Sequence, residues 1–269
     1  MVNPELASAL LDSYDRGVLM SELPSAAMPS FSMADAYAVA ELNRQRRMAR
    51  GERVLGYKIG FTNRSIWDRY GVHAPIWGPV WDSTVQLLDG AQGRTPLHRL
   101  VQPRLEPEVM FGFRLSPRRG MNEVELAGCI EWVAHGFEIV QTHFADWRFA
   151  AADTVADFAL HGRLFVGPRV PIERFADPRA ELAALKVRLL CGDRLVDEGE
   201  GAVVLDGPLT ALRLWIDAMS AQPHGWKVNP GDIVSTGTLT DAWPLSPGQT
   251  WSTELSDQRL SGLRLSIET

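Results

Sequence analysis

Two glutamates, Glu106 and Glu108, flank Pro107 in the otherwise apolar stretch RLEPEVMFGF, residues 104–113. Side chains two residues apart in a strand point to the same face, so a strand here would hold both carboxylates side by side. Neighbouring carboxylates repel each other, and their burial is costly unless a positive group joins them. A hard divalent cation with oxygen ligands would remove that repulsion. The alternative interpretation is a pair of solvated glutamates at a strand edge.

A metal site needs a third carboxylate, and a buried cation could share the charge. Glu138 is the best candidate ligand because it stands alone in the apolar stretch FEIVQTHF, residues 137–144, although a strand-edge glutamate is an equal alternative. Lys58 lies in VLGYKIGFT with glycines on both sides. It is either an edge lysine that discourages strand pairing or a desolvated proton carrier beside a ligand.

A third group of polar side chains lies in PGDIVSTGTLTDAWPL, where a turn feeds a strand that ends near Gly237. Ser235 and Thr238 stand on either side of this glycine. Hydroxyls and free N–H groups at such a strand end could cradle a carboxylate, and an ordinary turn is the alternative.

The whole chain limits the class of protein. It has 269 residues, of which 45% are hydrophobic, and 33 acidic against 27 basic residues give a net charge of −6. This charge argues against nucleic-acid binding, and no apolar run is long enough for a membrane span. The first residues carry Glu5 and Asp12 in place of a signal-peptide pattern. Cys129 and Cys191 then fit free thiols of a cytoplasmic protein.

The elements that must hold these residues follow from periodicity and punctuation. A Ser32 N-cap with Asp35 three residues on predicts the start of a helix that stops at Gly51. These patterns predict an α+β fold, with a helical segment over 1–52 and a larger mixed-β domain over 53–269, which we expect to form one integrated domain. The expected helices cover 4–16, 32–50, 122–135, 208–221 and a short stretch within 153–162. The expected strands cover 54–62, 108–115, 137–144, 163–170, 183–192, 232–237, 250–255 and 263–268.

Several stretches, in order, resemble the 2-keto-4-pentenoate hydratase/4-oxalocrotonate decarboxylase family of the fumarylacetoacetate hydrolase superfamily. They are GYKIGFTN, YGVHAPIWGPVWD, RLEPEVMFGF, FEIVQTHFADWRFAAADTVADFALHG and WKVNPGDIVSTGTLT. The resemblance covers most of the chain from residue 50 onward. It implies a mixed β-sheet or β-roll body of the superfamily's C-terminal-domain type, and a homo-oligomer.

The resemblance also implies a site. Mg²⁺ or Mn²⁺ would be bound by Glu106, Glu108 and Glu138. The remaining residues that it implicates are Lys58 and Asp82 as catalytic groups, and Ser235, Thr238, His73 and His161 as substrate-binding groups.

The implied reaction is hydration of a 2-hydroxy-2,4-dienoate, as in the catabolism of aromatic compounds. Proton relocation gives a 2-oxo-3-enoate, and water then adds to give a 4-hydroxy-2-oxo acid. The same site could decarboxylate a 2-oxo-3-enedioate. With His73 activating water it could instead hydrolyse a C–C bond of a diketo acid. A catalytically silent metal-binding partner subunit is the non-enzyme alternative.

The chain departs from the family pattern around the expected pocket. Phe158, Leu160 and His161 replace small or polar residues in DTVADFALHG, and His143 lies in EIVQTHF. His73 takes a position where the family often has an acid. Each of these histidines could also be purely structural. The departures predict a bulkier or more apolar substrate tail than that of pentenoate.

Overall fold

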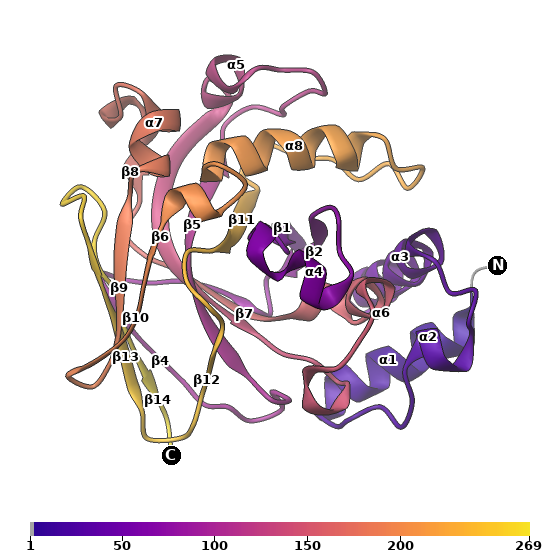
Figure 1. Ribbon diagram of the computed structural model, residues 1–269. Coiled ribbons are helices and arrows are strands. Elements are labelled where there is room, and N and C mark those ends of the chain that lie inside the picture. The colour runs from indigo at the N-terminus through magenta and orange to yellow at the C-terminus, as the bar shows by residue number, and fades with distance from the viewer. Residues whose placement is uncertain (1–2) are drawn as a thin grey trace.

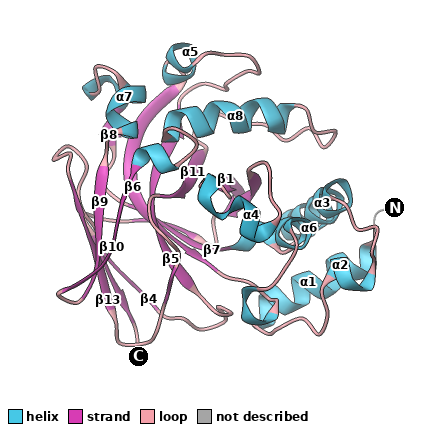
Figure 2. Cartoon of the chain, in the orientation of Figure 1, coloured by secondary structure: helices cyan, strands magenta, loops and turns pink. Residues whose placement is uncertain are grey.

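The computed structural model describes residues 3–269 and contains two β-sheets with helices at one end and across one face (Figures 1 and 2). Within these residues the larger sheet has nine strands in the order β2-β1-β11-β5-β6-β7-β3, with β12 beside β5 and β8 beside β6. Its strands are β1 (Val54–Gly60), β2 (Ile76–Trp81), β3 (Val85–Leu87), β5 (Arg104–Phe113), β6 (Ile130–Val140), β7 (His161–Val166), β8 (Val170–Pro171), β11 (Ile233–Thr238) and β12 (Trp243–Pro244).

The smaller sheet packs beside β5, β6 and β7 and has the order β10-β9-β13-β14-β4. Its strands are β4 (Gln92–Thr95), β9 (Lys186–Cys191), β10 (Arg194–Glu200), β13 (Thr250–Leu255) and β14 (Arg264–Ile267). The α-helices are α1 (Pro4–Arg16), α2 (Pro24–Ala27), α3 (Met33–Ala49), α4 (Trp67–Tyr70), α5 (Glu123–Ala127), α6 (Ala151–Ala156), α7 (Pro178–Ala183) and α8 (Pro208–Ser220). Short 3₁₀ turns are η1 (Arg64–Ile66), η2 (Ala145–Trp147), η3 (Phe158–Leu160), η4 (Ile172–Arg174) and η5 (Gly201–Val203).

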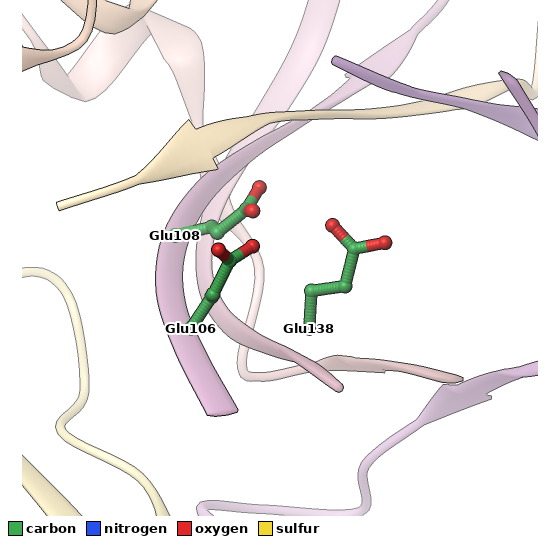
Figure 3. Close-up of side chains that lie close together, drawn as sticks. All are labelled: Glu106, Glu108 and Glu138. Atoms are coloured by element: carbon green, nitrogen blue, oxygen red, sulfur yellow. The ribbon is translucent and has the colours of Figure 1, made fainter. Parts of the chain in front are cut away.

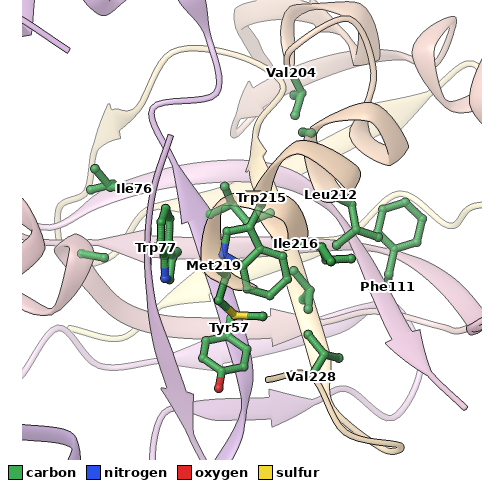
Figure 4. Close-up of a cluster of buried hydrophobic side chains, with 14 of the residues drawn as sticks. Tyr57, Ile76, Trp77, Phe111, Val204, Leu212, Trp215, Ile216, Met219 and Val228 are labelled. Atoms are coloured by element: carbon green, nitrogen blue, oxygen red, sulfur yellow. The ribbon is translucent and has the colours of Figure 1, made fainter. Parts of the chain in front are cut away.

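Helix α8 covers the large sheet through a continuous apolar face. Leu212, Trp215 and Ile216 of this helix are buried against β1 and β5, where Tyr57 and Phe111 face them (Figure 4). The rings of Tyr57 and Trp215 are 5.4 Å apart in a tilted arrangement. Burying large side chains of this kind stabilises the fold by roughly 1.5–3 kcal/mol each. The helix thereby holds β1, which carries Lys58, in a fixed position.

The N-terminal helices share this core. Leu10 of α1 and Tyr37 of α3 belong to the same buried cluster as Trp77 of β2, and the rings of Tyr37 and Trp77 are 4.6 Å apart. Helix α3 begins as expected, with Ser32 and Asp35 forming a reciprocal capping box. The boundary at residues 52 and 53 stays a prediction. None of the helices in residues 3–269 has the length and apolar character that a membrane crossing requires.

The α+β prediction is confirmed, but the helix expected over 122–135 is wrong for most of its length. Asn122 does cap a helix, yet α5 ends at Ala127 and β6 begins at Ile130. From there the chain pairs with β5 in antiparallel register, with Phe111 opposite Val133. Long-range pairing and burial between two strands outweigh the local helical periodicity in this segment.

Candidate metal centre and active site

Three carboxylates converge where β5 and β6 pair. Glu106 and Glu108 share one face of β5, and Glu138 of β6 lies directly opposite Glu106 in the antiparallel register. One carboxylate oxygen from each glutamate can be chosen so that all three lie within 4.8 Å of one another (Figure 3). Glu108 and Glu138 are fully buried, whereas Glu106 is partly exposed and lines a cleft.

Each of the two buried carboxylates has one oxygen fixed by the protein and one without a hydrogen bond. Glu108 accepts at Oε2 from the Ser235 hydroxyl and from the Gly237 N–H at 2.8 Å. Glu138 accepts at Oε1 from His161 Nδ1 at 2.8 Å. Among the described residues, Glu108 Oε1 and Glu138 Oε2 have no hydrogen-bond partner although both are buried. Orphaned carboxylate oxygens beside a third carboxylate are the donor set that a hard divalent cation takes, so the residues fit Mg²⁺ or Mn²⁺.

Lys58 supplies the positive charge next to this cluster. It is only 2% exposed, and its Nζ lies 3.3 Å from Glu138 Oε2. The same Nζ donates to the carbonyl of Ala159 at 3.0 Å. Its register partners are Gly78 of β2 and Ser235 of β11, so the central strands of the sheet fix where the lysine stands.

Burial and the neighbouring charges shift the pKa values of all four groups. Burial, followed by the neighbouring carboxylate of Glu138, raises the pKa of Glu108 to about 8. Burial likewise raises the pKa values of Glu106 and Glu138 above their ordinary range. Burial opposes the charge of Lys58, but the three glutamates together outweigh it and raise the pKa of the lysine. Without a cation the carboxylates therefore hold protons readily, and a cation would displace them.

The cluster opens into a cleft of about 610 Å³ that is partly open to solvent. Its lining includes the polar side chains of Lys58, Glu106 and Thr238. Its side walls are largely apolar and come from segments far apart in the sequence. These wall residues are Phe61, Ile76, Val140, Trp147, Phe149, Leu160 and Ala242.

Gln102 forms several of the hydrogen bonds that hold the wall containing Trp147. Gln102 donates from Nε2 to the Phe144 carbonyl at 2.8 Å and accepts at Oε1 from the Asp146 N–H at 2.9 Å. Its own carbonyl accepts from Trp147 Nε1 at 3.1 Å. The guanidinium carbon of Arg104, which also lines the cleft, is 4.1 Å from the Trp147 ring centroid.

A left-handed turn forms the floor beside Lys58. Phe158, Ala159 and Leu160 have φ values of 56°, 52° and 64°, a region that residues with a side chain seldom occupy. The turn points the Ala159 carbonyl at Lys58 and places Leu160 on the cleft. Consecutive strained residues of this kind gather at functional sites, where the surrounding structure holds them.

The structure gathers some of the residues predicted to bind substrate. Thr238 lines the cleft, and its hydroxyl donates to the Thr240 carbonyl at 2.9 Å. Ser235 is buried, and its hydroxyl is taken by Glu108. In this position Ser235 holds a carboxylate, and its contact with substrate stays a prediction.

The other predicted residues lie elsewhere. Asp82 pairs with Arg53, with Nε to Oδ2 at 2.9 Å, beyond the end of β2 that is remote from Gly78 and Lys58. Asp82 therefore lies away from the cluster, because it follows the end of β2 that pairs with the start of β1, four residues before Lys58. His73 is exposed in the loop before β2 and does not line the cleft.

The two remaining histidines are buried. His161 is bonded to Glu138 and is not among the residues that line the cleft, so its contact with substrate stays a prediction. His143 binds Asp157, with Nδ1 to Oδ1 at 2.6 Å, and packs against Tyr14. It makes no contact with the three glutamates among the described interactions.

Sequence reasoning missed three residues that line the cleft, Trp147, Phe149 and Arg104. Arg104 could have been found, because it lies two residues before Glu106 and so on the same strand face. Trp147 lies in a turn whose direction no periodicity predicts.

Comparison with known proteins gives the family. No family model matches the chain. It is 31% identical over 222 residues to the 2-hydroxyhexa-2,4-dienoate hydratase of Comamonas testosteroni, covering 82% of this chain and 81% of that protein. It is 30% identical over 255 residues to the 2-keto-4-pentenoate hydratase of Paraburkholderia xenovorans LB400, covering 94% and 90%. The 4-oxalocrotonate decarboxylase of a Pseudomonas species is 29% identical over 228 residues, covering 82% and 85%.

Solved structures agree on the fold. The 4-oxalocrotonate decarboxylase of Pseudomonas putida G7, complexed with magnesium and adipate, superposes with a TM-score of 0.89 at 23% identity and covers 98% of this chain and 96% of its own. The fumarylpyruvate hydrolase of Pseudomonas aeruginosa, in complex with Mn²⁺ and pyruvate, has a TM-score of 0.61 at 12% identity, covering 79% and 88%. The chain therefore belongs to the 2-keto-4-pentenoate hydratase family, and it shares its fold with the solved 4-oxalocrotonate decarboxylase.

Proposed function

We propose that the chain is a hydro-lyase that depends on Mg²⁺ or Mn²⁺ and adds water to a 2-hydroxy-2,4-dienoate in the catabolism of aromatic or related compounds. The hydratases among its relatives support the reaction. The observation that carries the proposal is the pair of orphaned, buried oxygens on Glu108 and Glu138, next to Lys58, which lines a cleft.

The cation would be held by Glu106, Glu108 and Glu138, and it would supply Lewis-acid stabilisation of negative charge on a 2-oxo acid. Lys58 Nζ is fixed between the Ala159 carbonyl and Glu138, where it can pass a proton to or from the bound acid.

The reaction relocates one proton and adds one water. The enol O–H proton moves to C5 to give the 2-oxo-3-enoate, after which the oxygen of water bonds to C4 and a proton goes to C3. Thr238, which lines the cleft, can hydrogen-bond the carboxylate head. The apolar walls keep bulk water from competing with these contacts.

The walls also bear on the substrate tail. Trp147, Phe149 and Leu160 present apolar surface in the cleft. We infer a tail that is more apolar or bulkier than that of 2-hydroxypentadienoate. Affinity should rise with each added methylene, which is worth about 0.8 kcal/mol on full burial.

The test is a steady-state assay of the purified full chain with Mg²⁺ or Mn²⁺ and 2-hydroxydienoates of several tail lengths. Loss of dienoate absorbance, with a 4-hydroxy-2-oxo acid as product, is expected. Glu108→Gln should abolish this activity, whereas Glu131→Gln, an exposed glutamate on β6, should keep it.

Other products would contradict the hydratase proposal and indicate a different reaction. Release of carbon dioxide from a 2-oxo-3-enedioate would make the chain a decarboxylase, the second candidate that a 29% identical relative favours. Two acids from a diketo acid would make it a C–C hydrolase. No turnover with Mn²⁺ still bound would leave a silent metal-binding subunit.

The homo-oligomeric state and cytoplasmic location stay predictions from the sequence. A small-molecule substrate is consistent with the hydratase relatives and with the cleft. Sedimentation velocity on the purified chain tests the oligomer, and a single species of 29.8 kDa would contradict it.

A further inference from the structure

His161 forms a buried hydrogen-bonded connection behind Glu138. Its Nδ1 is 2.8 Å from Glu138 Oε1, and its Nε2 is 2.8 Å from the hydroxyl of Thr84. His161 is only 1% exposed, so water does not compete for either ring nitrogen. The ring comes directly after the left-handed turn Phe158–Leu160.

The carboxylate of Glu138 at one end sets the proton positions along this connection. A carboxylate that binds a cation is ionised and only accepts, so Nδ1 must carry the proton that it donates to Glu138. A neutral ring then accepts at Nε2, and Thr84 donates to it. The Thr84 hydroxyl also lies 3.2 Å from the Trp81 carbonyl, a longer contact than the one to the ring, and accepts from the Trp81 N–H at 3.2 Å.

In both Glu108 and Glu138, one carboxylate oxygen is held by hydrogen bonds from the protein, although different residues donate them. Ser235 and the Gly237 N–H hold one oxygen of Glu108, while His161 holds one oxygen of Glu138. In each case the second oxygen is buried and takes no hydrogen bond, although Glu138 Oε2 forms an ion pair with Lys58 Nζ at 3.3 Å. A carboxylate held at one oxygen cannot rotate freely about its last torsion, so the other oxygen keeps its direction.

We propose that His161, itself oriented by Thr84, is a positioning residue that fixes Glu138 so that Oε2 is presented to the cation. This role rests on the proposed metal-dependent function and assigns a task that the sequence pattern alone had given to substrate contact. Outer partners of metal ligands typically change metal affinity 10- to 100-fold when they are removed.

Mn²⁺ titration calorimetry on the purified full chain tests the proposal without relying on turnover. His161→Leu removes both hydrogen bonds, whereas His161→Asn keeps a donor where Nδ1 stands. Of the two hydrogen bonds of His161, Thr84→Val removes only the outer one, and it also removes the contacts of the Thr84 hydroxyl with the Trp81 backbone. His143→Asn is the matched control, because His143 is equally buried and binds a carboxylate that is not part of the cluster. Thermal unfolding without metal reports whether each variant folds.

Mn²⁺ affinity should fall 10- to 100-fold in His161→Leu, return to within about threefold of wild type in His161→Asn, fall a few-fold in Thr84→Val, and stay unchanged in His143→Asn. Wild-type affinity in His161→Leu would overturn the proposal, as would equal losses in His161→Leu and His161→Asn, or an equal loss in the control. If His161→Leu does not fold, unchanged affinity in Thr84→Val overturns it. A wild-type chain that binds no Mn²⁺ overturns both this role and the metal-dependent function.

Discussion

Lys58 and the three glutamates form one electrostatic unit in which each charge depends on the others. The lysine is buried, and it is charged only because Glu138, Glu106 and Glu108 outweigh the cost of its burial. A bound cation would neutralise part of the negative charge that raises the pKa of Lys58. The lysine could then exchange a proton with the substrate more easily. Metal binding and proton transfer are therefore separable by mutation.

Replacing Lys58 with methionine should separate them. The side chain keeps its length but loses the proton carrier, so we expect kcat to fall by about 10²–10⁴. Mn²⁺ affinity should not weaken, because a repelling charge is removed from the site. Stopped-flow or steady-state assays with parallel calorimetry measure both. Lys186→Met, at an exposed lysine of β9, is the control, and weaker Mn²⁺ binding in Lys58→Met would contradict the separation.

Some contacts of the site residues could be predicted from the sequence, and others could not. The spacing of Glu106 and Glu108 predicted a shared face, and the structure has it. The partnership of His161 with Glu138 could not be predicted, because a β-bulge at Ile139 and Val140 shifts the register between β6 and β7. A shift of one residue exchanges the two faces of a strand.

At the scale of elements, the left-handed turn Phe158–Leu160 depends on a glycine in the neighbouring strand. A Cβ on Gly78 would lie 3.0 Å from Ala159 Cβ and 3.2 Å from the Phe158 carbonyl oxygen. Gly78 is also the register partner of Lys58. The missing side chain is what allows the turn to approach the lysine.

Gly78→Ala should therefore push the turn away and loosen the contact from Ala159 to Lys58. We expect a stability loss of about 1–3 kcal/mol from overpacking and a several-fold loss of kcat. Adding Ala159→Gly removes the nearer of the two contacts and suits the positive φ, so the double variant should recover part of both. Urea unfolding and kinetics test this, and full activity in Gly78→Ala would refute it.

A second element-scale feature joins the two sheets. His135 of β6 donates from Nδ1 to the Glu108 carbonyl at 3.0 Å, and its Nε2 is 2.8 Å from the hydroxyl of Thr253 on β13. Burial lowers the pKa of His135 to about 4. The folded protein therefore keeps this ring neutral at pH values where an unfolded histidine is already protonated.

The lowered pKa of His135 makes the free energy of unfolding depend on pH. Between pH 6.5 and 4 the unfolded state binds more protons at His135, so this group makes the free energy of unfolding fall as the pH falls. The full loss is roughly 3 kcal/mol, and none of it occurs above pH 7. Urea unfolding of wild type and His135→Gln at pH 7 and 4.5 measures it by difference. The variant should be less stable at pH 7 but less sensitive to acid, and parallel losses would rule out this histidine.

Elements that are fixed by contacts between residues near in sequence could be predicted, whereas those fixed by distant residues could not. The helices α1, α3 and α8 were predicted almost to their ends because caps and prolines mark them locally. The segment 130–135 was predicted as helix because its pairing with β5 is not a local property. Strand β10 was missed because its residues are mostly exposed and lack an apolar pattern.

At the scale of the whole molecule, the site is expected to reduce stability when no cation is present. Three clustered carboxylates repel each other, so Glu106→Gln should raise the unfolding temperature without metal by about 2–4 °C, equivalent to roughly 1 kcal/mol. Mn²⁺ at 100 times its dissociation constant should stabilise wild type by about 2.7 kcal/mol and the variant far less. Calorimetric unfolding with and without Mn²⁺ compares the two, and an equal metal response would count against Glu106 as a ligand.

The Gln102 anchor has a consequence for how this scaffold can diversify. The groups that would bind the head of a substrate lie on paired strands, whereas Trp147 and Phe149 come from a loop whose contacts with the body include the hydrogen bonds of Gln102 and the contact of Arg104 with the Trp147 ring. A library that varies residues 145–149 while keeping Gln102 would change one wall and leave the three glutamates in place. New tail preferences could then arise in the laboratory, or in natural descendants of this chain, without rebuilding the chemistry.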